Sequence, residues 1–334
     1  MKLIKITTIL VFTIIAVSIV FAVTKKPSFN AFISSVKQDA IKKGVSPKVA
    51  NKYLNHLTLP KPEKESVIVH LQKHQAQKVL SFAEYRQQFL NKANIPYAQQ
   101  QYKRYYTLLK GIEKKYQVPG QIIVSLWGIE SDYGRDMGSF PLVRSLAVLA
   151  YHHHRSEFYK RQLIDALIML NRPKVIPEQL ISAFDGGMGQ AQFEPSAYLS
   201  YAVDYNHDGF KNIWTNQADV FASIANFLHQ NGWNGQQSWG MLVKLPKNFP
   251  MKQAGRDFKY TVNHWKKLGV TKMNGKPLEN VKGKTAILAP NGKNGQAYLV
   301  YPNFKVLLRW NNTTFEGLST GILSDKIIGN KRKP

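Results

Sequence analysis

The sequence contains no cysteine, and acidic residues are scarce among its 334 residues. Without cysteine the chain can form no disulfide, and it has no cysteine to carry a lipid after export. Aspartate and glutamate number 20 against 46 lysine and arginine residues, a formal net charge of +26. This imbalance favours an anionic partner, whether nucleic acid, an anionic membrane or an acidic polymer such as a bacterial cell wall. The charge alone does not choose among them.

The chain also lacks internal repeats and low-complexity linkers. Hydrophobic residues make up 44% of it and aromatic residues 12%, which is enough for a substantial buried core. A chain of this length suits one large globular unit or two to three modest ones.

No charged residue lies between Ile6 and Val23, whereas lysines stand on both sides of this stretch. The pattern is typical of a secretory signal peptide, and its length also suits an uncleaved membrane anchor. An apolar core helix is the alternative, but such a helix should carry a polar face. We therefore expect a periplasmic, secreted or membrane-anchored protein, and export argues against a nucleic-acid partner.

Patterning along the chain predicts a mainly α fold (α+β) with a small β element. Residues 27–112 have helical periodicity with serine caps, and a motif-rich helical part follows. Short apolar runs punctuated by Gly, Pro and Asn, including QAYLVYPNFKVLLRW at 296–310, indicate strands and turns. The predicted segments are 1–26, a signal peptide or membrane anchor; 27–112, an N-terminal helical domain; 113–240, a helical core; 241–300, a small β-rich element; and 301–334, a C-terminal segment that returns to the core as a helix.

One glutamate lies on the apolar face of a predicted helix, PGQIIVSLWGIES at 119–131. Ile123, Leu126, Trp127 and Glu130 follow the spacing i, i+3, i+4 and i+7, so Glu130 points where the apolar side chains point. Burial and the negative end of the helix dipole both disfavour the charged carboxylate and raise its pKa. Such a group can serve as the general acid in glycosidic-bond cleavage. The alternative is a structural salt bridge to Arg135 or Arg144.

A second carboxylate, which most glycoside hydrolases use as nucleophile or base, is not found near Glu130 in the sequence. Asp132 faces away on the helix, while Asp185 and Glu194 are distant candidates. The missing partner suggests that a group of the substrate itself acts as nucleophile.

Three stretches together resemble the B-type (membrane-bound) lytic murein transglycosylases, whose catalytic domain is lysozyme-like. They are GIESDYGRDMG (128–138), GGMGQAQFEPSAYLSYAVDYNHDGFKNIW (186–214) and YPNFKVLLRWNN (301–312). The resemblance covers roughly residues 29–325. It implies a lysozyme-like catalytic core at 113–240 and an enzyme that cleaves the β-1,4 bond between N-acetylmuramic acid (MurNAc) and N-acetylglucosamine (GlcNAc) in peptidoglycan.

The resemblance also implies the roles of particular residues. Glu130 acts first as acid and then as base for the 6-hydroxyl of the same MurNAc, which yields a 1,6-anhydro product. Gln192, Asn311, Arg155 and Phe158 correspond to substrate-binding positions. Read without the resemblance, Gln192 and Asn311 are ordinary turn residues, and Arg155 and Phe158 lie on a helix face.

The sequence departs from the family pattern at four places. His153, His154 and Arg155 stand where members often have Pro-Arg-Arg, so one basic contact becomes titratable. The three adjacent histidines at 152–154 invite a metal reading, but consecutive side chains on a helix point about 100° apart and cannot readily share one ion. Ala183 replaces a serine that would bond the glutamate, and Asp185 is expected to raise the pKa of Glu130 if it approaches. Glu316 stands where an aromatic residue is common, so a stacking contact with substrate would be lost.

The segment DYNHDGFKNIWT at 204–215 matches the first half of an EF-hand loop. The calcium ligands predicted on this basis are Asp204, Asn206, Asp208, the carbonyl of Phe210, and Asp219. The alternative is an Asx-rich turn without metal. Any ion would be structural, and we expect no cofactor in the chemistry.

The leading hypothesis is thus a lytic transglycosylase that acts as a monomer on peptidoglycan glycan strands, with the membrane contacted through the N-terminal segment and no nucleic acid bound. The alternatives are a catalytically impaired peptidoglycan-binding protein and a lysozyme-type hydrolase that uses water, with Asp185 as helper.

Overall fold

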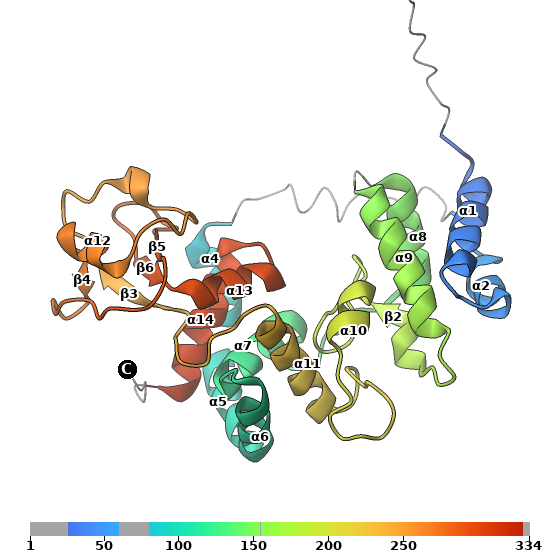
Figure 1. Cartoon of the computed structure of the whole chain (residues 1–334), viewed down its shortest axis with the longest axis horizontal. Helices are drawn as coiled ribbons and strands as arrows, with labels where there is room; N and C mark the ends of the chain where they lie inside the picture. Colours follow the sequence, from blue (N-terminus) through green and yellow to red (C-terminus); the bar gives the residue numbers. More distant parts are fainter. Residues whose placement is uncertain (1–25, 60–79, 154, 330–334) are drawn as a thin grey trace, which may run out of the picture.

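The computed structural model describes residues 26–59, 80–153 and 155–329, and Figure 1 shows their arrangement. The predicted signal peptide or anchor lies outside these residues. Within the described parts of the chain, no helix is long and apolar enough to cross a membrane. The predicted fold class, mainly helical with small sheets, is confirmed.

Serine caps begin the first helices, and those at Ser46 and Ser81 were predicted. Ser28 and Ser46 accept hydrogen bonds from backbone amides in the first turns of α1 (Phe29–Lys42) and α2 (Pro47–Leu54). A capping box between Ser81 and Glu84 begins α4 (Phe82–Phe89). Such caps satisfy amides that have no partner within the helix.

The helix that carries Glu130, α7 (Gly120–Ser131), runs through the centre of the fold. Nine of its residues are buried, which is more than one apolar face provides. The helices α5 (Asn94–Arg104), α6 (Tyr106–Tyr116), α11 (Gln217–Gln230) and α14 (Thr314–Ile328) pack against it. A buried hydrogen bond of 2.7 Å from Ser125 Oγ to the carbonyl of Thr320 joins α7 to α14.

A second helical layer lies beside this centre, and Figure 1 shows it next to α1 and α2. Its elements are β1 (Phe140–Pro141), α8 (Leu142–His152), α9 (Ser156–Leu170), the 3₁₀ helix η1 (Pro177–Leu180), β2 (Ile181–Ser182) and α10 (Pro195–Tyr201). The short strands β1 and β2 pair antiparallel, Phe140 opposite Ser182. This pairing fixes the start of the turn that leads to residues 183–193.

An antiparallel sheet forms the small β element, at the opposite end of Figure 1 from α1. Its strand order is β4-β3-β6-β5. The elements are β3 (Gly240–Lys244), η2 (Met251–Gln253), α12 (Val262–Lys267), β4 (Thr271–Lys272), β5 (Ala286–Leu288) and β6 (Ala297–Val300). Trp265, fully buried, and Phe249 belong to a separate hydrophobic cluster within this part of the chain.

The prediction for residues 296–310 was wrong in its second half. Only Ala297–Val300 is strand, and α13 (Pro302–Trp310) follows at once. Pro302 occupies the first turn, where its missing N–H leaves no bond unmade. The buried residues that follow Pro302 lie on one face of this helix. Because the apolar residues of the run 296–310 are almost continuous, the helical periodicity is hard to see in the sequence. The predicted terminal helix is confirmed as α14.

Candidate active site

Glu130 lies in the last turn of α7 on the predicted face. Ile123, Leu126 and Trp127 are buried on that face, and the side chain of Glu130 is half-buried. The dipole of α7 places its negative end here. The helix therefore holds a carboxyl group at a position that disfavours its charged form.

The residues after Glu130 explain why the helix stops there. Asp132 and Tyr133 have left-handed backbone conformations, with φ of 49° and 60°, and Gly134 continues the turn with φ of 82°. The ring of Tyr133 packs on Gly128, where a Cβ would lie only 2.5 Å from the ring. The glycines of this motif thus permit a reversal that keeps Glu130 at the helix end.

A buried glutamine fixes the same helix end. Gln190 accepts a hydrogen bond of 2.7 Å from the Trp127 indole, and its backbone carbonyl accepts one of 2.7 Å from Ser131 Oγ. The indole and hydroxyl donors are buried, so each needs such a partner. Gln190 therefore orients Trp127 and Ser131, which lie before and after Glu130 on α7.

The structural salt bridge considered for Glu130 does not form. Arg135 pairs instead with Asp132 at 2.6 Å in an exposed position, and among the described residues no ion pair involves Glu130. Its partners are the indole of Trp310, whose Nε1 donates to Oε1 at 2.5 Å, and the carboxyl group of Glu316.

The expectation that Glu130 has no carboxylate partner is wrong. Glu316 lies in the first turn of α14, is 8% exposed, and its carboxyl group lies close enough to that of Glu130 to raise the pKa of Glu130. Asn311 Nδ2 donates to Glu316 Oε2 at 2.5 Å. Helix packing brings the first turn of α14 to the end of α7, and sequence spacing gives no sign of it. Glu316 therefore contributes a second acid to the site, where we had expected only the loss of an aromatic contact.

The surroundings raise the pKa of both glutamates. The pKa of Glu130 lies well above its ordinary value, first because of burial, then because of the charge of Glu316; the hydrogen bond from Trp310 opposes this. Burial raises the pKa of Glu316 to about 7, against the hydrogen bonds from Glu130 and Asn311. Burial and the neighbouring charge thus favour the protonated form of Glu130.

Tyr85, on α4, was not identified from the sequence. Burial raises the pKa of its hydroxyl, and the charges of Glu316 and Glu130 raise it further, so its ring lies near both glutamates. Its ring centroid is 5.9 Å from that of Phe315. Tyr85 and Trp310 had no sequence signal of their own, because their place in the site depends on how α4 and α13 pack.

A second group of charged residues lies near the site. Asp185 contributes to the raised pKa of Glu130, in the direction expected, and also to that of Glu194. Burial, then Asp185, raises the pKa of Glu194 to about 7, and Arg155 opposes this. Arg155 is exposed at the start of α9, and its guanidinium lies 4.0 Å from the ring centroid of Phe158. The two predicted residues therefore lie together, on the side of the acidic pair Asp185 and Glu194.

Gln192 lies in the tight turn that connects Met188 and Phe193. Its backbone is left-handed, with φ of 48°, and its Nε2 donates to the carbonyl of Gly189 at 2.8 Å. Phe193 places this turn next to the site, because its ring centroid lies 5.4 Å from that of Trp310, the residue that bonds Glu130. Ala183 has no side-chain donor, and its backbone amide bonds the carbonyl of Gly187 at 2.7 Å.

The predicted calcium loop is held together by its own hydrogen bonds. Backbone amides of Asp208 and Gly209 donate to Asp204, and those of Tyr205 and Asn212 donate to Asp219. Among the described residues no group of three or more His, Cys, Asp or Glu side chains is placed to hold a metal ion. The side chains of Asp204, Asn206, Asp208 and Asp219 are thus all bonded within an Asx-rich turn.

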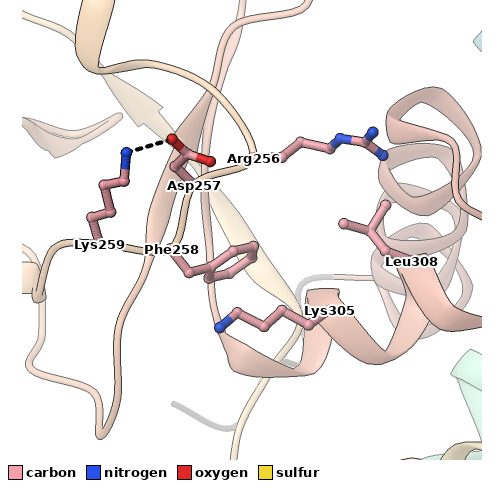
Figure 2. A pocket seen from close by; sticks show the side chains of 6 residues that line it. All are labelled: Arg256, Asp257, Phe258, Lys259, Lys305 and Leu308. Carbon is pink, nitrogen blue, oxygen red and sulfur yellow. Dashed lines mark hydrogen bonds and ion pairs between the residues drawn. The ribbon is translucent and has the colours of Figure 1, made fainter. Parts of the chain in front are cut away.

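A cavity of about 290 Å³ lies between residues 256–259 and α13 (Figure 2). It is lined by Arg256, Asp257, Phe258, Lys259, Lys305 and Leu308. Asp257 pairs with Lys259 at 2.7 Å, and the Lys305 ammonium lies 4.5 Å from the Phe258 ring centroid. Arg256 donates to the carbonyl and side chain of Asn312, the residue after Asn311. The cavity is therefore cationic and adjoins the segment that holds Glu316.

The model of the transglycosylase SLT domain family matches residues 28–325. The membrane-bound lytic murein transglycosylase B of Escherichia coli is 29% identical over 245 residues, which cover 73% of this chain and 66% of that protein, slightly less than two thirds of its length.

Solved structures give the same result. SltB3 from Pseudomonas aeruginosa, in complex with NAG-NAM-pentapeptide, is 32% identical, with a TM-score of 0.84 over 91% of this chain and 81% of that one. The Escherichia coli lytic transglycosylase Slt35 in complex with calcium is 24% identical, with a TM-score of 0.75 over 89% of this chain and 92% of that one. The second likeness is one of fold alone.

Proposed function

The chain belongs to the transglycosylase SLT domain family, and we propose that it is a lytic transglycosylase that cleaves the MurNAc–GlcNAc β-1,4 bond of peptidoglycan and leaves 1,6-anhydro-MurNAc ends. The observation that carries the proposal is Glu130, a carboxyl group at the end of α7 that accepts a hydrogen bond from Trp310 and whose pKa is raised by burial and by Glu316. A relative of known structure, SltB3, binds NAG-NAM-pentapeptide, a fragment of this polymer.

In the first step Glu130 acts as general acid. Its proton passes to the glycosidic oxygen as the bond from C1 to that oxygen breaks, and the oxygen leaves with the bonding electron pair. Positive charge then develops at C1 in an oxocarbenium-like transition state. The carboxylate of Glu316, which lies near Glu130, favours that positive charge electrostatically.

In the second step Glu130 acts as general base. Its carboxylate accepts the proton of the 6-hydroxyl of the same MurNAc while O6 forms a bond to C1, which closes the anhydro ring. The hydrogen bond from Trp310 stabilises the carboxylate form, the state needed between the two steps. No water is consumed, and Glu130 recovers its proton.

Gln192, Asn311, Arg155 and Phe158 form the proposed substrate-binding set. Asn311 lies next to Trp310 and bonds Glu316, so in this reading it orients the second acid as well as the sugar. Arg155 and Phe158 lie together and offer a cation and an apolar ring to one ligand group. The Gln192 amide, held in the turn through Nε2, presents an acceptor to an N-acetyl or hydroxyl group.

The overall charge of +26 and the cationic cavity of Figure 2 support an anionic polymer as partner. We propose that the protein acts outside the cytoplasm as a monomer, with residues 1–26 as signal peptide or membrane anchor. No step of the reaction needs a cofactor. Calcium at Asp204, Asn206, Asp208, Phe210 and Asp219 is proposed as a structural ion only.

A lysozyme-type hydrolase is the second candidate, because Glu316 supplies the additional carboxylate that activation of water requires. Digestion of purified peptidoglycan in heavy-oxygen water separates the two. Anhydro ends without the label support the transglycosylase, and labelled reducing ends support the hydrolase. A digest without new ends supports the catalytically impaired binding protein.

A further inference from the structure

Glu130 and Glu316 come from opposite ends of two packed helices. Glu130 lies in the last turn of α7, and Glu316 is the third residue of α14, whose first turn meets that helix end. Their carboxyl groups lie within reach of each other, and a hydrogen bond between them forms when one of them carries a proton. The protonation of one glutamate therefore depends on that of the other.

Glu316 does not use its side chain for the local bond that its position offers. Thr313 caps α14, and its Oγ1 accepts from the Glu316 amide at 3.3 Å. A glutamate three residues after such a cap commonly reaches back to the amide of the cap residue. Here the carboxyl group bonds Asn311 and Glu130 instead. The side chain is thus directed into the site, away from the helix terminus.

The two helix dipoles assign different states to the two glutamates. The negative end of α7 disfavours a carboxylate at Glu130, whereas the positive end of α14 favours one at Glu316. The donor Asn311 Nδ2 on Glu316 favours the carboxylate there as well. Both effects place the proton on Glu130 and the negative charge on Glu316.

The segment between α13 and α14 holds this arrangement. Trp310, Asn311 and Asn312 are consecutive: the first bonds Glu130, the second bonds Glu316, and the third accepts two hydrogen bonds from Arg256 at 2.8 and 3.1 Å. Figure 2 shows Arg256 extending from its loop towards α13, away from Asp257. The β element is thereby tied to the residues that orient the acid pair.

We propose that Glu316 is a positioning residue that holds the proton of Glu130, so that the two carboxyl groups share one proton at neutral pH with the charge on Glu316. The contacts that carry this are the bond between the two acids, the Asn311 bond to Glu316 and the Trp310 bond to Glu130. The effect of Glu316 on catalysis rests on the proposed function. The sharing of a proton between the two glutamates does not.

The other groups that face the pair strengthen this assignment. Tyr85 faces it from α4, and Asp185 faces it from the turn after β2. The negative charge of Asp185 raises the pKa of Glu130, as the charge of Glu316 does. Among the described residues no lysine, arginine or histidine forms an ion pair with either glutamate, so no cation cancels the charge of Glu316.

Carboxyl ¹³C NMR titration of protein labelled at glutamate Cδ tests the proposal without any need for turnover. Glu130→Gln identifies the resonance of Glu130. In Glu316→Gln the midpoint of Glu130 should fall by about one pH unit or more, because the neighbouring charge is gone. In Trp310→Phe it should rise, because the donor that stabilises the carboxylate is gone.

Opposite shifts in two variants of one pocket are not expected from a purely structural role. Glu157→Gln, at an exposed position on α9, is the matched control and should leave the midpoint unchanged. Circular dichroism confirms that each variant is folded. If the Glu130 midpoint is the same in wild type and Glu316→Gln, the proposal is overturned. Glu316→Asp, which keeps the charge, should keep the midpoint nearer to that of wild type than Glu316→Gln does.

Activity provides a second readout. The alkaline limb of kcat/KM should move to lower pH in Glu316→Gln and to higher pH in Trp310→Phe. If the titrations shift as described and no variant releases products, the shared proton stands and the proposed function fails. If products form but the Glu130 midpoint does not respond to Glu316→Gln, the function stands and the role of Glu316 fails.

Discussion

Glu316→Gln should stabilise the fold at alkaline pH. The ordinary pKa of the side chain is 4.5, and burial raises it to about 7 in the folded protein. Between these values the folded state binds more protons than the unfolded state, so stability falls as the pH rises through about 7. A rise of about 2.5 in pKa, at 1.36 kcal/mol for each pH unit, corresponds to about 3 kcal/mol at pH 8.

The glutamine variant carries no charge at any pH and can still accept the bond from Asn311. At pH 8 it should therefore be more stable than wild type by about 2–3 kcal/mol, or roughly 5 °C in Tm for a chain of this size. At pH 4 the two proteins should melt within about 1 °C of each other, because Glu316 is then protonated in both the folded and the unfolded state for most of the population.

Urea unfolding and thermal melting at pH 4, 6 and 8 measure this difference, with Glu157→Gln as the control for loss of an exposed charge. A variant that is as stable as wild type, or less stable, at pH 8 would refute the reasoning, since the ionised Glu316 would then cost nothing in the fold. A gain that is equal at all three pH values would also contradict it.

Three further predictions concern other parts of the molecule. Gly128→Ala should lower the free energy of unfolding by about 1–3 kcal/mol, because its Cβ meets the Tyr133 ring at 2.5 Å; Gly111→Ala, where the nearest atom is the Tyr205 hydroxyl at 3.3 Å, is the matched control and should be close to neutral. If calcium binds at residues 204–219, millimolar calcium should raise Tm relative to a chelator in wild type and not in Asp208→Ala; equal melting in both solutions counts against the site. Lys305→Ala should raise KM for peptidoglycan a few-fold at low salt, with the difference from wild type fading at about 1 M salt; a difference that persists at high salt would show that charge is not its basis.

Local patterns in the sequence were enough to predict the catalytic helix. Periodicity placed Glu130 inward beside Leu126 and Trp127, and the glycines of GIESDYG marked the end of the helix. These signals are local, because a helical face and a left-handed turn each depend on residues a few positions apart. The serine caps of α1, α2 and α4 were predictable for the same reason.

The partners of Glu130 could not be predicted in this way. Trp310 and Glu316 are far from it in sequence, and only the packing of α13 and α14 against the end of α7 brings them close. The run at 296–310 was read as extended because its apolar residues are almost continuous, and the helix at Pro302 was missed. An error in that element concealed the donor to Glu130, and the acid at Glu316 was judged only by the aromatic residue that it replaces.

The central claim is that Glu130 donates the proton that breaks the glycosidic bond and that O6 of the same sugar then attacks C1. The most direct test is mass analysis of muropeptides released from purified peptidoglycan by wild type and by Glu130→Gln. Wild type should release anhydro ends, one water lighter than hydrolysis products, and the variant should lose at least about 100-fold in rate while melting at a similar temperature. Reducing ends from wild type, or anhydro products released by the variant at the wild-type rate, would contradict the account.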